Sequence, residues 1–147
     1  MTLLERLSQE MKTAMMAKDA DRLSALRMLK SAVGYAQIER KENLADADVV
    51  SLVQKEIKKR RDAIEQYEKG GRPELAAKEK AEVGVLEGFL PQPLSPQELE
   101  QLVRVAIQET GATTKKEMGA VIKAVQAKAA GRADGRTISA LVGKLLN

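Results

Sequence analysis

Apolar residues recur at intervals of three and four along nearly the whole chain, the spacing that places them on one face of an α-helix. No stretch shows the alternation of apolar and polar residues that would indicate a β-strand. The pattern predicts four long helices, over residues 3–18, 22–40, 49–69 and 73–88, and three shorter helices after residue 95. The expected fold class is therefore all-α.

Short local signals mark where these helices are expected to begin and end. A Ser or Thr three residues before a Glu has the spacing of a capping box, and this spacing occurs at Thr2, Ser95 and Thr114. Pro96 directly follows Ser95 and suits the first position of a helix, where no amide hydrogen is needed. Gly131 is predicted to end the sixth helix in a left-handed conformation.

A proline-rich segment divides the chain. Three prolines lie within residues 89–99, and no helix is expected to pass through them. We therefore predict an elongated four-helix domain over 1–90, a stiff joint over 91–95, and a compact three-helix domain over 96–147.

The densest basic run, KKRR at 58–61, invites a nucleic-acid interpretation. However, Glu56 precedes Arg60 by four residues, and Arg61 precedes Glu65 by the same interval. Pairs at this spacing are ordinary on helix surfaces and contribute about 0.3 kcal/mol each. We interpret the run as an exposed, charged helix face, with nucleic-acid binding as the alternative.

Composition excludes several kinds of chemistry. The chain has no Cys and no His, which removes disulfides, thiolate nucleophiles, histidine acid–base catalysis and nearly all zinc sites. With one Phe, two Tyr and no Trp, it also lacks the aromatic platforms that stack single-stranded bases. We expect no cofactor and no metal. Charged residues near the start and the lack of a long apolar run predict a cytoplasmic protein without membrane contact.

Positive charge is concentrated towards the end of the chain. Residues 96–147 hold eight Lys or Arg against five Asp or Glu, which suits an anionic partner. Lys116, Gly119 and Lys123 are expected to share a strip pointing away from the apolar face of the sixth helix. A glycine inside a helix costs roughly 1 kcal/mol relative to alanine, so something is expected to approach the backbone there. A phosphate strand and a packed helix are the two alternatives.

The turn between the last two helices, GRADGR, is the other candidate contact. Arg132 and Arg136 flank it, and Asp134 is placed to cap the final helix. Our hypothesis assigns RNA binding to these two arginines together with the strip on the sixth helix. The alternative is a plain helix–helix turn, since glycine-rich corners are routine between helices.

Several segments resemble the YqeY-like family: LLERLSQEMKTAM at the start, LRMLKSA at 26–32, FLPQPLSPQEL at 89–99, and the terminal MG…GRADGR…LVGKLL. The C-terminal part is similar to the tail of the GatB subunit of the tRNA-dependent amidotransferase. The positions that match the tail motif are Met118, Gly119, Gly131, Arg132, Ala133, Asp134, Gly135 and Leu141. The resemblance implies an α-helical N-terminal domain followed by a small helical unit that grasps tRNA.

Three functions follow from the residues and the resemblance. The first is a non-catalytic tRNA-binding accessory module. The second is an adaptor that docks an aminoacyl-tRNA synthetase or an amidotransferase subunit. The third is a carbon–nitrogen ligase with glutamine as amido donor, implied by the resemblance alone. We expect no catalytic residues, because no histidine can activate a Ser or Thr and neither a P-loop nor a GxGxxG motif is present.

Overall fold

The computed structural model describes residues 1–146, and all regular structure within that range is helical. The residues divide into two compact units, one spanning Met1–Leu90 and the other beginning at Pro91. Each unit has its own hydrophobic core. The all-α fold class expected from the apolar spacing is confirmed.

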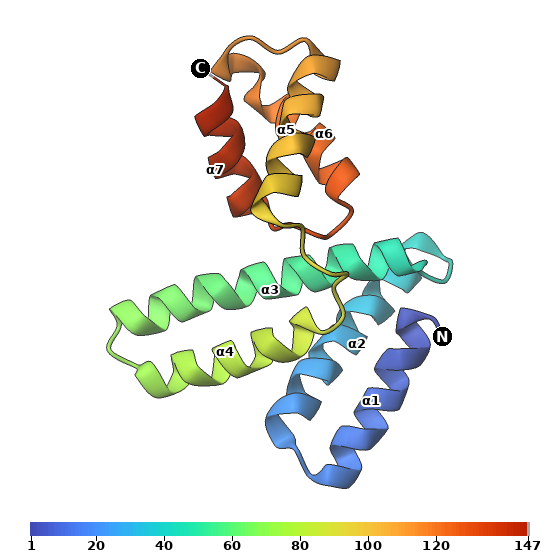
Figure 1. Ribbon diagram of the computed structural model, residues 1–147. Helices are drawn as coiled ribbons and strands as arrows, with labels where there is room; N and C mark the ends of the chain where they lie inside the picture. The colour runs from blue at the N-terminus through green and yellow to red at the C-terminus, as the bar shows by residue number, and fades with distance from the viewer. Residues whose placement is uncertain (147) are drawn as a thin grey trace. The chain divides into compact units, whose positions relative to one another are not determined.

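The N-terminal unit consists of two helical hairpins. Its helices are α1 (Leu3–Ala17), α2 (Ala20–Arg40), α3 (Asp46–Lys69) and α4 (Pro73–Glu87). α3 and α4 run antiparallel and side by side, as Figure 1 shows. Gly71, with φ of 72°, reverses the chain between them, a conformation that glycine adopts without steric cost.

The caps of α1 and α3 differ in how closely they follow the sequence signals. Thr2 and Glu5 form the predicted capping box, with the Glu5 amide donating to the Thr2 hydroxyl at 3.1 Å. α3 begins earlier than expected, after Ala45, whose amide donates to Asp48 at 3.1 Å. Arg40 lies 2.9 Å from the same carboxylate, and both contacts lower the pKa of Asp48.

Aliphatic side chains from all four helices, together with one aromatic ring, fill the N-terminal core. The fully buried members include Leu26, Leu29, Val49, Val53, Leu86 and Phe89. Phe89 is in the turn after α4, and the Arg6 guanidinium lies 4.7 Å from its ring centroid. Met15 of α1 lies next to the buried Ala14 but is itself 55% exposed.

A buried charge cluster joins α3 to α4. The guanidinium of Arg60 lies 3.3 Å from Glu56, 3.4 Å from Glu82 and 3.9 Å from Glu79. The residues Arg60, Glu56 and Glu82 are 6%, 6% and 5% exposed. The interpretation of KKRR as a wholly exposed face is therefore wrong at Arg60. The three-and-four spacing on α3 cannot reveal this burial, because two of the carboxylates come from α4.

Burial raises the pKa of Glu79 above its ordinary value of 4.5; the charge of Glu82 adds to the effect and Arg60 opposes it. The folded protein therefore binds this proton more strongly than the unfolded chain does. The resulting stability is fully present below about pH 4.5 and is lost as pH rises through the raised pKa.

Glu79→Gln, which resembles the protonated form, should remove this dependence. The stability of wild type relative to Glu79→Gln should fall as pH is raised from 4 to 8, measured by urea unfolding at each pH. Glu74→Gln, on an exposed part of α4, is the matched control. A constant difference between wild type and Glu79→Gln would contradict the assignment.

The C-terminal unit packs three helices around a second core (Figure 1). They are α5 (Pro96–Thr110), α6 (Met118–Ala129) and α7 (Gly135–Leu145), and a single turn of 3-10 helix, η1 (Lys115–Glu117), precedes α6. Its fully buried side chains include Val103, Val121, Val125, Ile138 and Val142.

Two of the three cap predictions in this unit are confirmed and one is wrong. Ser95 and Glu98 form the expected capping box at the start of α5. Asp134 accepts a hydrogen bond from the Thr137 amide at 2.7 Å and caps α7. The Thr114 capping box is absent. Glu117 instead accepts a hydrogen bond from the Thr113 amide, and η1 lies between Thr114 and the start of α6.

Candidate nucleic-acid interface

The carboxylates of the C-terminal unit are all engaged within that unit. Glu98 and Asp134 cap helices, and Glu117 accepts from the Thr113 amide. Glu100 pairs with Arg104 at 2.7 Å, and Glu109 pairs with Lys128 at 3.0 Å. Glu100 and Glu109 are thus paired with Arg104 and Lys128, and Glu98 lies 3.9 Å from Arg132, so these carboxylates do not form ion pairs with the remaining lysines.

Four lysines of the same unit have no ion pair among the described residues. They are Lys115, Lys116, Lys123 and Lys144, and all four are exposed. The sequence hypothesis named Lys116 and Lys123 and missed the other two. Adjacency to Lys116 was the signal available for Lys115, whereas nothing in the local pattern singled out Lys144.

The surface around Gly119 is open. A Cβ added to this glycine would meet no heavy atom within 4 Å, so no helix in the described part of the C-terminal unit packs against it. Gly119 and Lys123 are four apart on α6 and therefore share a face. Lys116 lies one turn earlier in η1, so the single continuous helix assumed for the three residues is interrupted at Glu117.

Arg132 has a structural role that the sequence did not indicate. Its Nε donates to the Gln92 carbonyl at 2.8 Å, and its own carbonyl accepts from the Leu94 amide at 2.8 Å. A guanidinium nitrogen also lies 3.9 Å from Glu98. Arg132 thus fastens the proline-rich segment to the corner between α6 and α7, which leaves less of its guanidinium for a phosphate.

The rest of the corner is built around chain reversal. Ala130 and Gly131 are both left-handed, with φ of 48° and 86°, so the predicted conformation of Gly131 is confirmed. Asp134 occupies amides at the start of α7 that could otherwise hold an anion. Arg136 is exposed and makes a contact of its own within the chain.

Met118 and Gly135 act in packing. The methyl group of Met118 approaches Gly143 of α7 so closely that a Cβ there would lie 3.3 Å from it. Gly135 begins α7 beside Gln126, at a distance where a Cβ would make ordinary contact. Met118 therefore packs where α6 begins and α7 ends, whereas Gly135 lies at the corner, and neither residue presents a charge.

The described residues contain no cluster of three or more His, Cys, Asp or Glu side chains arranged to hold a metal ion. Between residues 1 and 146, no helix has both the length and the apolar character needed to cross a membrane. The C-terminal unit presents exposed ammonium groups beside an open stretch of helix backbone at Gly119.

The sequence of this chain is similar to those of several fungal proteins. "Altered inheritance of mitochondria protein 41, mitochondrial" of Pyrenophora tritici-repentis is 30% identical over 135 residues, covering 89% of this chain and 73% of that protein. "Uncharacterized protein C22F3.15" of Schizosaccharomyces pombe is 38% identical over 79 residues, covering 54% of this chain and 64% of that protein. A protein of the same name as the Pyrenophora relative, from Vanderwaltozyma polyspora, is 32% identical, covering 66% of this chain and 54% of that protein.

The names of the Pyrenophora and Vanderwaltozyma relatives place those two proteins in mitochondria, and the cytoplasmic location expected for this chain stays a prediction. The family model described as "Yqey-like protein" matches residues 4–146, which includes both units and the segment between them. The resemblance drawn from the separate sequence motifs therefore extends to a match over nearly the whole chain, and the chain belongs to the YqeY-like family.

Proposed function

We propose that this chain is a non-catalytic accessory module that binds tRNA through its C-terminal unit. The observation that carries the proposal is the charge imbalance of that unit. Its five carboxylates all have partners, whereas Lys115, Lys116, Lys123 and Lys144 have no ion pair within the described residues. Lysines left without carboxylates suit the phosphate backbone of a nucleic acid.

Gly119 adds a place where a phosphate strand can come close. With no side chain there and no neighbour within 4 Å, the backbone of α6 is accessible beside Lys123. Binding of this kind relies on charge and shape and reads little base sequence. The choice of tRNA rests on the resemblance of the C-terminal segment to the tail of the GatB subunit. In this proposal Arg132 holds the corner, and the lysines make the contacts.

Removing two of the lysines should weaken binding in a salt-dependent way. For Lys116→Ala/Lys123→Ala, the slope of log affinity against log salt should become less steep by about 2, because each lysine lost removes roughly one unit. Filter binding of purified bulk tRNA over a potassium chloride series measures this slope. Lys55→Ala/Lys58→Ala removes the same charge from exposed positions of α3 and should leave the slope unchanged.

The two double variants distinguish binding by the C-terminal lysines from a general effect of the protein's net charge. If both double variants lose affinity equally, net charge alone drives binding. If neither variant differs from wild type, the assignment of this surface is wrong.

Filling the open position at Gly119 tests close approach directly. Gly119→Leu should lower tRNA affinity roughly tenfold, equivalent to about 1.4 kcal/mol, while leaving the charge unchanged. Gly84→Leu in α4 is the control, because it is also an exposed helical glycine with nothing within 4 Å. Equal affinities for the two variants would remove Gly119 from the interface.

A further inference from the structure

α2 exposes an apolar face that no other part of the N-terminal unit covers. Met28, Tyr35 and Ile38 are 54%, 76% and 76% exposed, which is unusual for three large side chains on one helix. They lie on one side of α2 with small residues between them. This side, here called the outer face, consists of Ala20, Ser24, Arg27, Met28, Ser31, Gly34, Tyr35 and Ile38.

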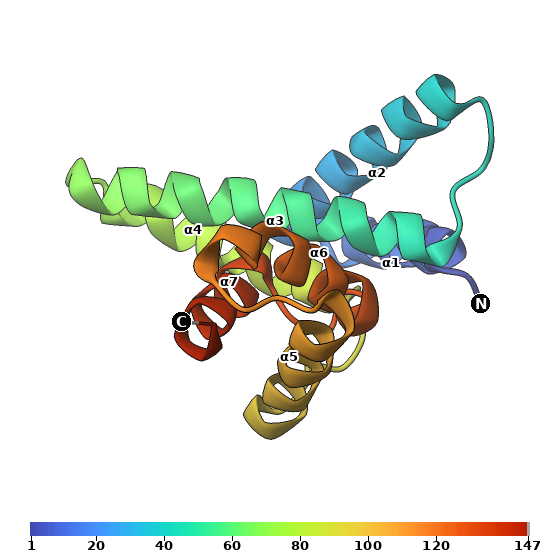
Figure 2. The same ribbon diagram turned by 90° about the horizontal axis from the view of Figure 1, so that it is seen from above.

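The outer face lies opposite the buried face of the same helix. The residues that α2 contributes to the core are Ala25, Leu26, Leu29 and Val33. At 100° per residue, the two sets lie on opposite sides of the helix axis. A surface helix normally has a single apolar stripe, so a second stripe indicates a second contact. In Figure 2 the last turns of α2 extend away from α1 and α3.

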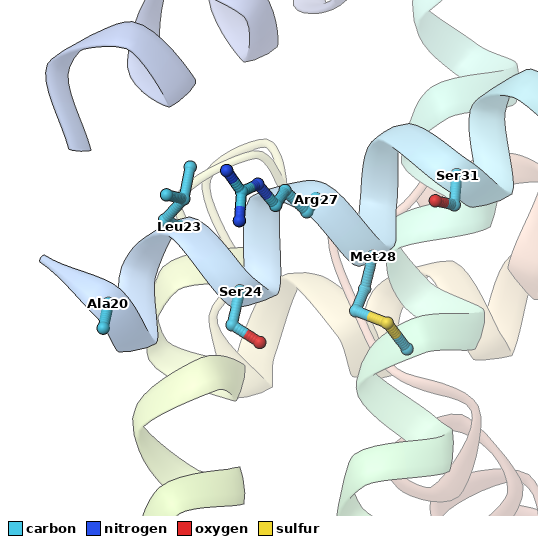
Figure 3. A pocket seen from close by; sticks show the side chains of 6 residues that line it. All are labelled: Ala20, Leu23, Ser24, Arg27, Met28 and Ser31. Carbon is cyan, nitrogen blue, oxygen red and sulfur yellow. The ribbon is translucent and has the colours of Figure 1, made fainter. Parts of the chain in front are cut away.

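Two shallow hollows follow one another along the outer face. Figure 3 shows the first, where the side chains of Leu23 and Arg27 border one edge of the outer face and those of Ser24 and Met28 border the other edge. The second is lined by Gly34, Gln37, Ile38, Lys41, Glu42 and Asn43. A Cβ at Gly34 would meet nothing within 4 Å, so there is open space above this glycine in the second hollow.

We propose that two copies of this chain associate through their outer faces, with the α2 helices antiparallel about a two-fold axis between Gly34 and Tyr35. In that register, Tyr35 of each copy meets Gly34 of the other, and Ile38 meets Ser31. Tyr35 and Ile38 are thus matched to small residues on both sides of the axis, and Met28 falls opposite the Lys41 position. A two-fold interface uses the same patch on both partners, so this self-complementarity is what it requires.

The charges along the outer face also favour a second copy of this chain as the partner and an antiparallel arrangement of the two α2 helices. Arg27 lies towards one end of the outer face and Glu42 borders the other, and neither has an ion pair among the described residues. Glu42 follows the left-handed Lys41 at the end of α2 and lines the second hollow with Gly34 and Ile38. The antiparallel register therefore brings Arg27 of one copy towards Glu42 of the other, twice per dimer. A parallel pairing would instead place like charges together. The face therefore supplies both halves of its own electrostatic match.

Sedimentation equilibrium over a concentration series tests the proposal. Wild type should shift with concentration from 16.0 kDa towards twice that mass. Gly34→Leu should weaken the dimer at least tenfold by filling the site for Tyr35. It should also raise the melting temperature of the dilute monomer, because leucine favours a helix more than glycine does. Gly84→Leu should leave the dimer unchanged.

Charge exchange identifies the register. Arg27→Glu alone and Glu42→Arg alone should each weaken self-association, because each places like charges opposite one another. An equimolar mixture of the two variants should recover a dimer of one chain of each kind, in which both contacts are attractive. If the mixture stays monomeric while wild type dimerises, the register is wrong.

A wild type that remains at 16.0 kDa at the highest concentration overturns the proposal. The outer face would then be assigned to a different protein. Dimerisation of Gly34→Leu with wild-type affinity would overturn it equally, because the contact at the axis would not exist.

Discussion

Arg60→Met should lower the free energy of unfolding by about 3–5 kcal/mol, the usual effect of removing one partner from a buried ion pair. The substitution removes the guanidinium that lies 3.3 Å from Glu56 and 3.4 Å from Glu82; Glu56 keeps Lys59 at 3.2 Å, whereas Glu82 is left buried without this partner. Urea unfolding at neutral pH, followed by circular dichroism, measures the loss. Much of it is the penalty of the stranded carboxylates and not the net contribution of the cluster.

Two further variants separate these contributions. Lys80→Ala breaks the exposed pair with Glu68, which also joins α3 to α4, and should cost less than about 1 kcal/mol. Replacing Arg60, Glu56 and Glu82 together with apolar residues of similar volume should restore most of the stability lost in Arg60→Met. An Arg60→Met protein as stable as the Lys80→Ala protein would contradict the burial of this arginine.

Phe89→Ala should cost about 3–5 kcal/mol, because it leaves a cavity where the ring now fills the N-terminal core. Phe89 is 2% exposed and packs against the cluster formed by the four helices. Thermal or urea unfolding of the purified chain measures the effect. Phe89→Leu, which keeps most of the volume, should cost clearly less.

The guanidinium over the ring has a smaller expected role. Arg6→Ala should cost roughly 0.5–1 kcal/mol from the cation–π contact, together with a modest loss from its 2.7 Å pair with Glu10. If Phe89→Ala were no more costly than Arg6→Ala, the side chain of Phe89 would not be the core element that its burial indicates.

Part of the candidate interface can be predicted from the sequence, and its role in binding stays a prediction. Lys116, Gly119 and Lys123 were selected because of their spacing, and the structure leaves all three exposed. Arg132 was selected because it borders a glycine-rich turn, and the structure gives its Nε to the carbonyl of Gln92, forty residues away. The sequence offers no sign of that partner, because the contact depends on how the proline-rich segment returns to the corner.

The sequence by itself determined the helices, most of their caps and the composition of the two cores. Capping at Ser95 and Asp134 depends on residues no more than three positions away, so local spacing is enough to predict it. Apolar periodicity likewise selects the buried side of each helix without reference to its neighbours.

Tertiary structure decided the features that join distant segments. The burial of Arg60 requires carboxylates from α4, and the role of Arg132 requires a carbonyl from the proline-rich segment. The outer face of α2 can be recognised only from the structure, which shows that the core covers the opposite side of this helix. In each case the deciding neighbour lies far along the chain, where periodicity and capping carry no information.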